Sequence, residues 1–347
     1  MSKEYTRKKD TENFKKLQAQ LLLLPPFCRE YFIGVAQRTS ILTRLNYAHD
    51  LSIFFEFAIQ NTPAMMYLQT KDITLTHLED LDVSDIELFL AYLDSFERKE
   101  TLHSNSLVAK ARKLSSLRSL FKYFFRKDKL TRDVTAKVPT PKLRDKNIIR
   151  LEIHEIKKIL DIAEHGNTAL TTREQAFHKL TATRDLAILT LFLGTGIRIS
   201  ELVGLNLQDF DFDNGDFRVT RKGGKTDTLF FSNEIGIALA DYLKVRKSAE
   251  TDTSALFLSL QNKRISTRAV QNLVKKYAKQ AAPLKAITPH KLRSTYGTNL
   301  YRETGDIYVV AEVLGHKDIN TTKKHYAAMS EDIKRKAANK VILREKD

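Results

Sequence analysis

The segment KVPTPKLRDKN, residues 137–147, constrains the fold of this chain more than any other stretch. It carries two prolines and several basic residues but no apolar periodicity, and each proline disfavours helix in the residue before it. Such a segment predicts an extended linker rather than part of a packed core. Because 347 residues are enough for two domains with separate cores, we expect one domain on each side of the linker. The expected boundaries are a polar, basic extension (1–24), a helical domain (25–136), the linker (137–149), a second domain (150–330) and a tail helix (331–347).

The charge of the chain indicates a polyanionic partner. Lysine and arginine number 58 against 42 aspartate and glutamate residues, which gives a formal net charge of +16 and a pI near 9.6. Nucleic acid is the first candidate for such a protein, although a merely basic protein would have the same totals.

Hydropathy and cysteine content favour a soluble protein of a reducing compartment. The longest apolar run is LAILTLFL (186–193), whereas a membrane span needs about 20 residues. The charged amino terminus lacks the apolar region of a secretory signal. Cys28 is the only cysteine, which excludes an internal disulfide. We therefore expect no membrane partner and a cytoplasmic, nucleoid-associated location.

Hydrophobic periodicity predicts helices in the first domain. An apolar stripe at spacings of three and four runs from Leu45 to Phe55, and Ser84 followed by Glu87 matches a capping box. A further helix over residues 110–126 is apolar on one side and basic on the other. A solvated face would normally mix signs, so this face favours contact with phosphates. The expected phosphate-contacting residues lie on this helix and in the linker: Lys110, Arg112, Lys113, Arg118, Lys122, Arg126, Lys142 and Arg144.

The second domain reads as mostly helical with a small sheet, a mainly α fold of the α+β class. The run TRDLAILTLFL (183–193) predicts a buried helix that the glycines of GTG end. Strands are expected at residues 217–220 and 228–232, with the glycine turn of RKGGK (221–225) between them as a hairpin. Helical patterns resume over residues 233–247 and 266–282, and again from about Pro289.

Four short segments of this domain need a common explanation. They are GTGIRISEL (194–202), RKGGK (221–225), TPHKLR (288–293) and LGHKDINTTKKHY (314–326). Each alone has an ordinary structural interpretation, such as an ion pair between Arg198 and Glu201. Together they supply the groups that phosphodiester chemistry needs. Arginine forks can bind nonbridging phosphate oxygens, a lysine or histidine can protonate a leaving alkoxide, and a tyrosine oxygen can attack phosphorus.

With these motifs in this order, the chain resembles a tyrosine recombinase of the phage-integrase and Xer family, over roughly residues 30 to 335. The resemblance implies a role for each matching residue: Arg198 and Arg293 as the phosphate-binding arginines, Glu201 as the acidic support, Lys222 as the hairpin lysine with Lys225 as the fallback, His290 and His316 as the histidines, and Tyr326 as the nucleophile. The gap from His316 to Tyr326 is one residue longer than is usual in the family, and His325 occupies the usual tyrosine position.

The resemblance implies site-specific DNA strand exchange through a 3′-phosphotyrosine intermediate, without a cofactor, metal ion or ATP. It implies a helical core-binding domain and a mixed α/β catalytic domain that close on duplex DNA as a C-shaped clamp. The expected partners are double-stranded DNA carrying a recombination site and further copies of the chain in a tetramer. An accessory protein is a further candidate partner. The tail helix would dock on a neighbouring protomer or pack on its own domain.

Two alternatives remain open from the sequence. A topoisomerase of the type IB kind would share the chemistry but would not pair two DNA sites. A catalytically silent, sequence-specific DNA-binding protein would share the basic surface and need no nucleophile. The sequence also leaves open whether the chain resolves chromosome dimers or integrates a mobile element.

Overall fold

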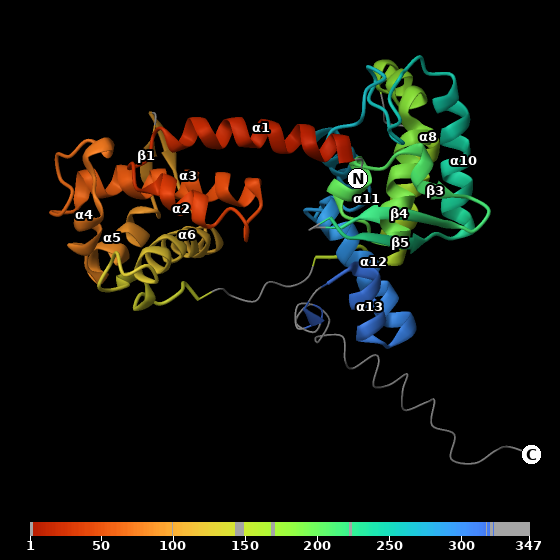
Figure 1. The fold of residues 1–347 in the computed structure, drawn as a ribbon. Coiled ribbons are helices and arrows are strands. Elements are labelled where there is room, and N and C mark those ends of the chain that lie inside the picture. The colour runs from red at the N-terminus through yellow and green to blue at the C-terminus, as the bar shows by residue number, and fades with distance from the viewer. Residues whose placement is uncertain are drawn as a thin grey trace, which may run out of the picture. The chain divides into compact units, whose positions relative to one another are not determined.

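The computed structural model describes residues 3–98, 100–142, 149–167, 171–221, 224–316, 318, 319 and 322. The chain divides into two compact units (Figure 1). The amino-terminal unit consists of residues 6–146, and the carboxyl-terminal unit of residues 147–347 together with residues 1–5. The division falls inside the predicted linker.

The amino-terminal unit is helical apart from one short hairpin. Its elements are α1 (Lys3–Leu21), α2 (Cys28–Gly34), α3 (Ile41–Asn61), the 3₁₀ helix η1 (Thr70–Asp72), α4 (Leu75–Glu79), α5 (Val83–Tyr92), β1 (Phe96–Arg98), β2 (Thr101–His103), α6 (Leu107–Phe125) and the 3₁₀ helix η2 (Val134–Ala136).

Aromatic side chains fill the core of this unit. The rings of Phe54 on α3 and Phe89 on α5 meet edge to face with centroids 5.2 Å apart, and both side chains are fully buried. The helices begin where polar caps replace missing hydrogen bonds. Ser40 accepts from the amide of Thr43 at 3.2 Å at the start of α3, and Ser106 opens α6 in the same way.

The structure of this unit differs from the sequence analysis in three places. Most of the segment expected as an extension is the helix α1, whose polar sequence carries little amphipathic pattern. The capping box of α5 is formed by Asp82 and Asp85, two residues before the predicted Ser84–Glu87 pair, because the Asp82 carboxylate reaches the Asp85 amide at 3.0 Å. The β1–β2 hairpin was not predicted, since its strands have only three residues each.

The carboxyl-terminal unit packs helices around a small antiparallel sheet. Its elements are α7 (Ile153–His165), α8 (Thr172–Thr195), α9 (Ile199–Val203), the 3₁₀ helix η3 (Leu207–Asp209), β3 (Phe210–Asp211), β4 (Asp216–Thr220), β5 (Thr226–Phe230), α10 (Asn233–Lys247), α11 (Thr267–Ala281), α12 (Pro289–Thr304) and α13 (Ile307–Leu314).

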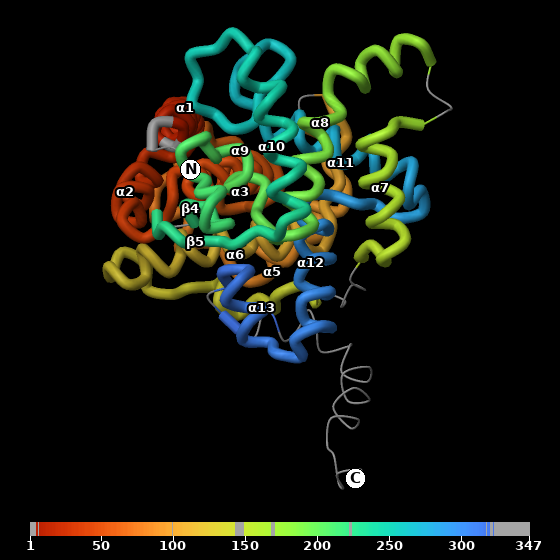
Figure 2. Tube along the Cα trace, turned by 90° about the vertical axis from the view of Figure 1, so that its right-hand side faces the viewer, coloured from red at the N-terminus to blue at the C-terminus, as the bar shows by residue number. Residues whose placement is uncertain are grey.

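The helix α8 is the centre of this unit, as its apolar sequence predicts. It packs against α7, α10 and α12, and residues 187–192 are buried within the core (Figures 1 and 2). It ends at Gly196, which adopts the left-handed conformation with φ +61°. A Cβ atom there would lie 2.5 Å from the ring of Tyr296, so both the backbone angle and the space require glycine.

The predicted hairpin is present. Strand β4 pairs antiparallel with β5 in a register that sets Phe217 opposite Leu229 and Thr220 opposite Thr226, and β3 adds a third strand. Phe217 and Leu229 face the core, while Arg218 and Thr228 are exposed. The mainly helical fold with small antiparallel sheets is therefore confirmed. In the part of the chain that the structure describes, no helix is both long and apolar enough to cross a membrane.

A buried carboxylate ties α3 to α6 in the amino-terminal unit. Asp50, 2% exposed, accepts from the hydroxyl of Ser116 at 2.8 Å and pairs closely with the guanidinium of Arg112. The ammonium of Lys113 lies 3.9 Å from the same carboxylate and donates to Asn105 at 2.7 Å. Burial raises the pKa of Asp50 and lowers the pKa of Lys113, because both charged forms lose water.

The first prediction tests this buried pair. Asp50→Asn keeps the side-chain shape but leaves the buried Lys113 charge without its carboxylate, so we expect a loss of about 3–5 kcal/mol in local stability. Hydrogen exchange of the α3 and α6 amides, followed by mass spectrometry in the full chain, measures it. Asp50→Asn combined with Lys113→Met should recover part of the loss. Unchanged exchange in the single variant would show that the pair contributes nothing to stability.

Candidate active site and nucleic-acid interface

Three arginines meet at the carboxyl end of α13. A helix leaves its last carbonyl groups without intrahelical partners. In this helix the carbonyl of Val313 accepts from Arg221 at 2.9 Å, that of Leu314 from Arg293, and that of Gly315 from Arg198 at 3.1 Å. Cations at this end are also favoured by the helix dipole. The site is therefore assembled around one short stretch of backbone, residues 313–315.

Arg198 is placed by the turn that ends α8 and begins α9. It is the N-cap residue of α9, and its amide donates to a Glu201 carboxylate oxygen at 2.9 Å. Its guanidinium donates to the other oxygen of Glu201 at 2.8 Å. Glu201 is 2% exposed, whereas the Arg198 side chain is 33% exposed. The predicted pair is thus present, with the acid inside and the arginine reaching towards the surface.

Arg293 is held by the first turns of α12. Thr288 caps this helix and Pro289 occupies its first turn, a position where proline needs no hydrogen-bond donor. Arg293 is 4% exposed and also donates to the carbonyl of Gly196 at 2.6 Å. His290 lies three residues earlier in the exposed first turn, so the two side chains share one side of α12.

His316 follows the end of α13 directly. Gly315 turns the chain with φ +60°, and the Nδ1 atom of His316 lies 2.8 Å from the hydroxyl of Thr322. Arg198, Glu201, Arg293 and His316 are therefore brought together around residues 313–316, as the motifs predicted.

Several predicted residues lie outside the described part of the chain. These are Lys222, Tyr326, Arg144 and the tail 331–347. Among the other late tyrosines, Tyr296 and Tyr301 pack against the buried residues of α13, as expected. Burial raises the pKa of Tyr296, which disfavours its phenolate. Tyr308 was expected to pack but is 68% exposed.

Sequence reasoning missed Arg221. This arginine follows the hairpin strand β4 directly and is 8% exposed, with Glu201 and Asp227 both 3.1 Å from its guanidinium. It stands beside Lys222 in the RKGGK turn, where it looked like one more surface cation. The alternation of the strand gave the only hint, since Phe217 and Val219 point inward and Arg221 continues that pattern.

The basic helix α6 uses much of its charge inside its own unit. Lys110 is 7% exposed and pairs with Asp94 at 2.6 Å, while Lys113 is buried beside Asp50. Arg118 donates to the backbone carbonyls of Thr135 and Val138. These three residues therefore have structural roles that argue against phosphate contact. Of the other predicted residues, Arg112, Lys122, Arg126 and Lys142 are exposed, although Arg112 is also paired with Asp50.

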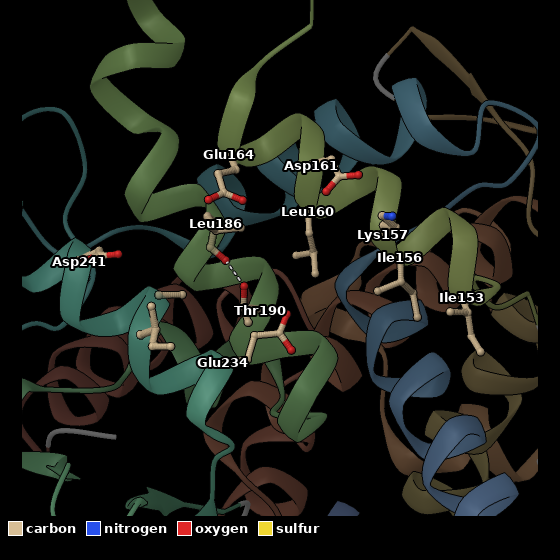
Figure 3. Close-up of a pocket in the computed structure, with 12 residues that line it drawn as sticks. Ile153, Ile156, Lys157, Leu160, Asp161, Glu164, Leu186, Thr190, Glu234 and Asp241 are labelled. Atoms are coloured by element: carbon tan, nitrogen blue, oxygen red, sulfur yellow. Dashed lines mark hydrogen bonds between the residues drawn. The ribbon is translucent and has the colours of Figure 1, made fainter.

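A groove of about 410 Å³ on the carboxyl-terminal unit is a separate feature (Figure 3). Side chains of α7, α8 and α10 line it, and the four acids Asp161, Glu164, Glu234 and Asp241 are among them. None of the predicted site residues lines the groove, and its acidic side chains do not suit a polyanion. Among the described residues, no cluster of histidine, cysteine, aspartate and glutamate has the composition to hold a metal ion.

Comparison with known proteins shows the family of the chain. Residues 150–332 match the model of the phage integrase family. The chain is 34% identical over 333 residues to the tyrosine recombinase XerC of Caldanaerobacter subterraneus subsp. tengcongensis, and the match covers 92% of this chain and 88% of that protein.

Two solved structures share the fold. One is the XerH site-specific recombinase bound to palindromic difH substrate, a post-cleavage complex, with 19% identity, a TM-score of 0.64 and coverage of 88% of this chain and 82% of that one. The other is a lambda integrase (75–356) dimer bound to a COC′ core site, with 18% identity, a TM-score of 0.59 and coverage of 85% and 95%. The chain belongs to the phage integrase family and is a Xer-like site-specific tyrosine recombinase, an enzyme of DNA strand exchange.

Proposed function

We propose that the cluster around residues 313–316 binds the scissile phosphate of a recombination site and that Tyr326 attacks it. The observation that carries this proposal is the convergence of Arg198 and Arg293 on neighbouring carbonyls of one turn, beside His316. Two guanidiniums fixed in this way are preorganised for an anion, because their positions are set before substrate arrives.

Each group has one role in the proposed step. Arg198 and Arg293 bind the nonbridging oxygens, and His290 and His316 donate hydrogen bonds to the phosphate. The Tyr326 oxygen forms a bond to phosphorus, and the phenol proton passes to solvent water. The bond from phosphorus to the 5′-oxygen breaks, and Lys222 gives that oxygen a proton, with Lys225 as the fallback. The 5′-hydroxyl of a partner strand reverses the step, so the bond energy is conserved and no metal, cofactor or ATP enters.

Strand exchange also needs partners. We propose that the enzyme pairs two DNA sites as a homotetramer, with the two units closing on each duplex and the 331–347 tail docking on a neighbouring protomer. The XerH recombinase bound to difH substrate and the lambda integrase dimer bound to a COC′ core site support the DNA partner. A cytoplasmic, nucleoid-associated location is proposed with it, supported by the single cysteine.

Covalent capture tests the nucleophile. In a duplex nicked a few bases to the 3′ side of the scissile phosphate, cleavage releases a short fragment with a free 5′-hydroxyl. The protein–DNA link therefore accumulates on a denaturing gel. Tyr326→Phe should abolish capture because it lacks the attacking oxygen, while one-site DNA binding stays nearly unchanged. The matched control is Tyr301→Phe, which changes a packed phenol and should still capture DNA. The reverse pattern would assign the attack to Tyr301.

The proposed binding of phosphate by Arg198 and Arg293 predicts a loss in the rate of cleavage. Arg293→Lys should slow cleavage by about 10²–10³, because an ammonium cannot reproduce a fork that also donates to Gly196 and Leu314. Single-turnover cleavage with saturating enzyme measures it. Cleavage at the wild-type rate would remove Arg293 from the proposed phosphate site and leave it a structural residue.

The basic surface predicts the salt dependence of binding. Affinity should fall by about 10³–10⁵ between 50 and 200 mM salt if about 6–10 phosphates are neutralised. Replacing the exposed Lys122 and Arg126 with glutamine should lower the slope of log affinity against log salt by about 2, since each phosphate contact contributes about one unit. The matched change is Lys110→Gln with Asp94→Asn, which removes an ion pair of a buried lysine with an exposed aspartate and should leave the slope unchanged. Equal slopes in both proteins would place the phosphate contacts elsewhere.

A further inference from the structure

The guanidinium of Arg221 joins three elements of the carboxyl-terminal unit. Its Nε donates to Asp227 on β5 at 3.1 Å, its Nη1 to Glu201 on α9 at 3.1 Å, and its Nη2 to the carbonyl of Val313 on α13 at 2.9 Å. All three nitrogens thus donate into the protein. Because these three bonds end on three different elements, the side chain is placed to hold other groups of the protein.

The turn after α13 lies directly against this guanidinium. A Cβ atom on Gly315 would be 3.1 Å from both Cζ and Nε of Arg221. Glycine is therefore needed both for φ +60° and for the close approach of the backbone to the arginine. The carbonyl of Gly315 is the one that accepts from Arg198, and the next residue is His316.

Besides the 313–315 turn, Glu201 also connects Arg221 to Arg198. One carboxylate oxygen accepts from Nη1 of Arg221 and from the amide of Arg198, and the other accepts from the Arg198 guanidinium. Without Arg221, the buried Glu201 charge would be balanced by Arg198 alone. The carboxylate could then turn towards Arg198 and draw its fork away from the phosphate.

We propose that Arg221 is a positioning residue for strand cleavage, which fixes Glu201 and the 313–315 turn and through them aligns Arg198 and His316 on the scissile phosphate. This inference rests on the proposed function, because it assigns a support to the same site. It separates the three arginines of the turn into two that face substrate and one that faces the protein.

Single-turnover cleavage of the nicked duplex by saturating full-length enzyme tests the role. Arg221→Met should slow cleavage by about 10²-fold, as expected when reacting groups are misplaced by about 1 Å, with the Kd for one site unchanged. Arg221→Lys should remain slow, because one ammonium cannot reach acceptors on three elements. The matched control is Arg218→Met, which removes an exposed arginine from strand β4 and should cleave at the wild-type rate. Wild-type cleavage by Arg221→Met, or full rescue by lysine, would overturn the proposal.

A double variant separates positioning from general damage. Because Arg221 is proposed to act on Arg198 as well as on His316, Arg198→Ala with Arg221→Met should lose clearly less rate than the product of the two single losses. Losses that multiply would mean that Arg221 works by an independent route and would overturn the inference.

A milder variant covers the case in which Arg221→Met does not fold. Asp227→Asn changes a side chain that is 39% exposed and weakens one anchor of Arg221, so cleavage should fall by about tenfold, as for other supporting hydrogen bonds around an active site. No loss would count against the proposal. If the wild type itself never captures DNA, the result contradicts both the proposed function and this inference. A wild type that captures DNA beside an equally fast Arg221→Met protein overturns the positioning role alone.

Discussion

The open carboxyl end of α13 is the constraint on which the site depends. Three consecutive carbonyl groups, from residues 313–315, each accept a hydrogen bond from a different guanidinium. Three cations this close would repel one another, but carbonyl oxygens and the negative end of a helix offset that repulsion. The arginines lie on or directly beside α9, β4 and α12, so this helix end also determines how those three elements meet. Backbone acceptors thus hold the cations of the proposed phosphate site in place.

Glu201 balances part of the positive charge of this arginine cluster. It is the buried acid that both Arg198 and Arg221 share. A buried carboxylate is costly unless it is paired, and here the pairing also fixes the direction of the Arg198 fork. With Asp227, the two acids balance Arg198 and Arg221 in number. Arg293 is held in the same cluster by the carbonyls of Gly196 and Leu314.

The sequence predicted what depends on local pattern and order. The hairpin, the helix α8 and the meeting of Arg198, Glu201, Arg293 and His316 follow from periodicity and motif spacing, and they are present. The sequence could not show that Arg221 is buried, because its partners lie 20 residues before it and 92 after it in the chain. The helix α1 was missed for a related reason: it lacks an amphipathic stripe, so periodicity gives no evidence for it.

The basic helix α6 shows why a count of charges overstates a binding surface. Its sequence places cations on one side, yet Lys110 and Lys113 are turned inward to Asp94 and Asp50, and Arg118 holds the chain that leads into the linker. Long aliphatic stems allow such residues to contribute packing and a buried ion pair at once. The helix therefore offers fewer cations to a phosphate than its number of basic residues suggests, and its exposed cations include Lys122. In the proposed function, affinity for the duplex would draw on exposed cations of the amino-terminal unit, whereas chemistry at the phosphate would depend on the arginine cluster of the carboxyl-terminal unit.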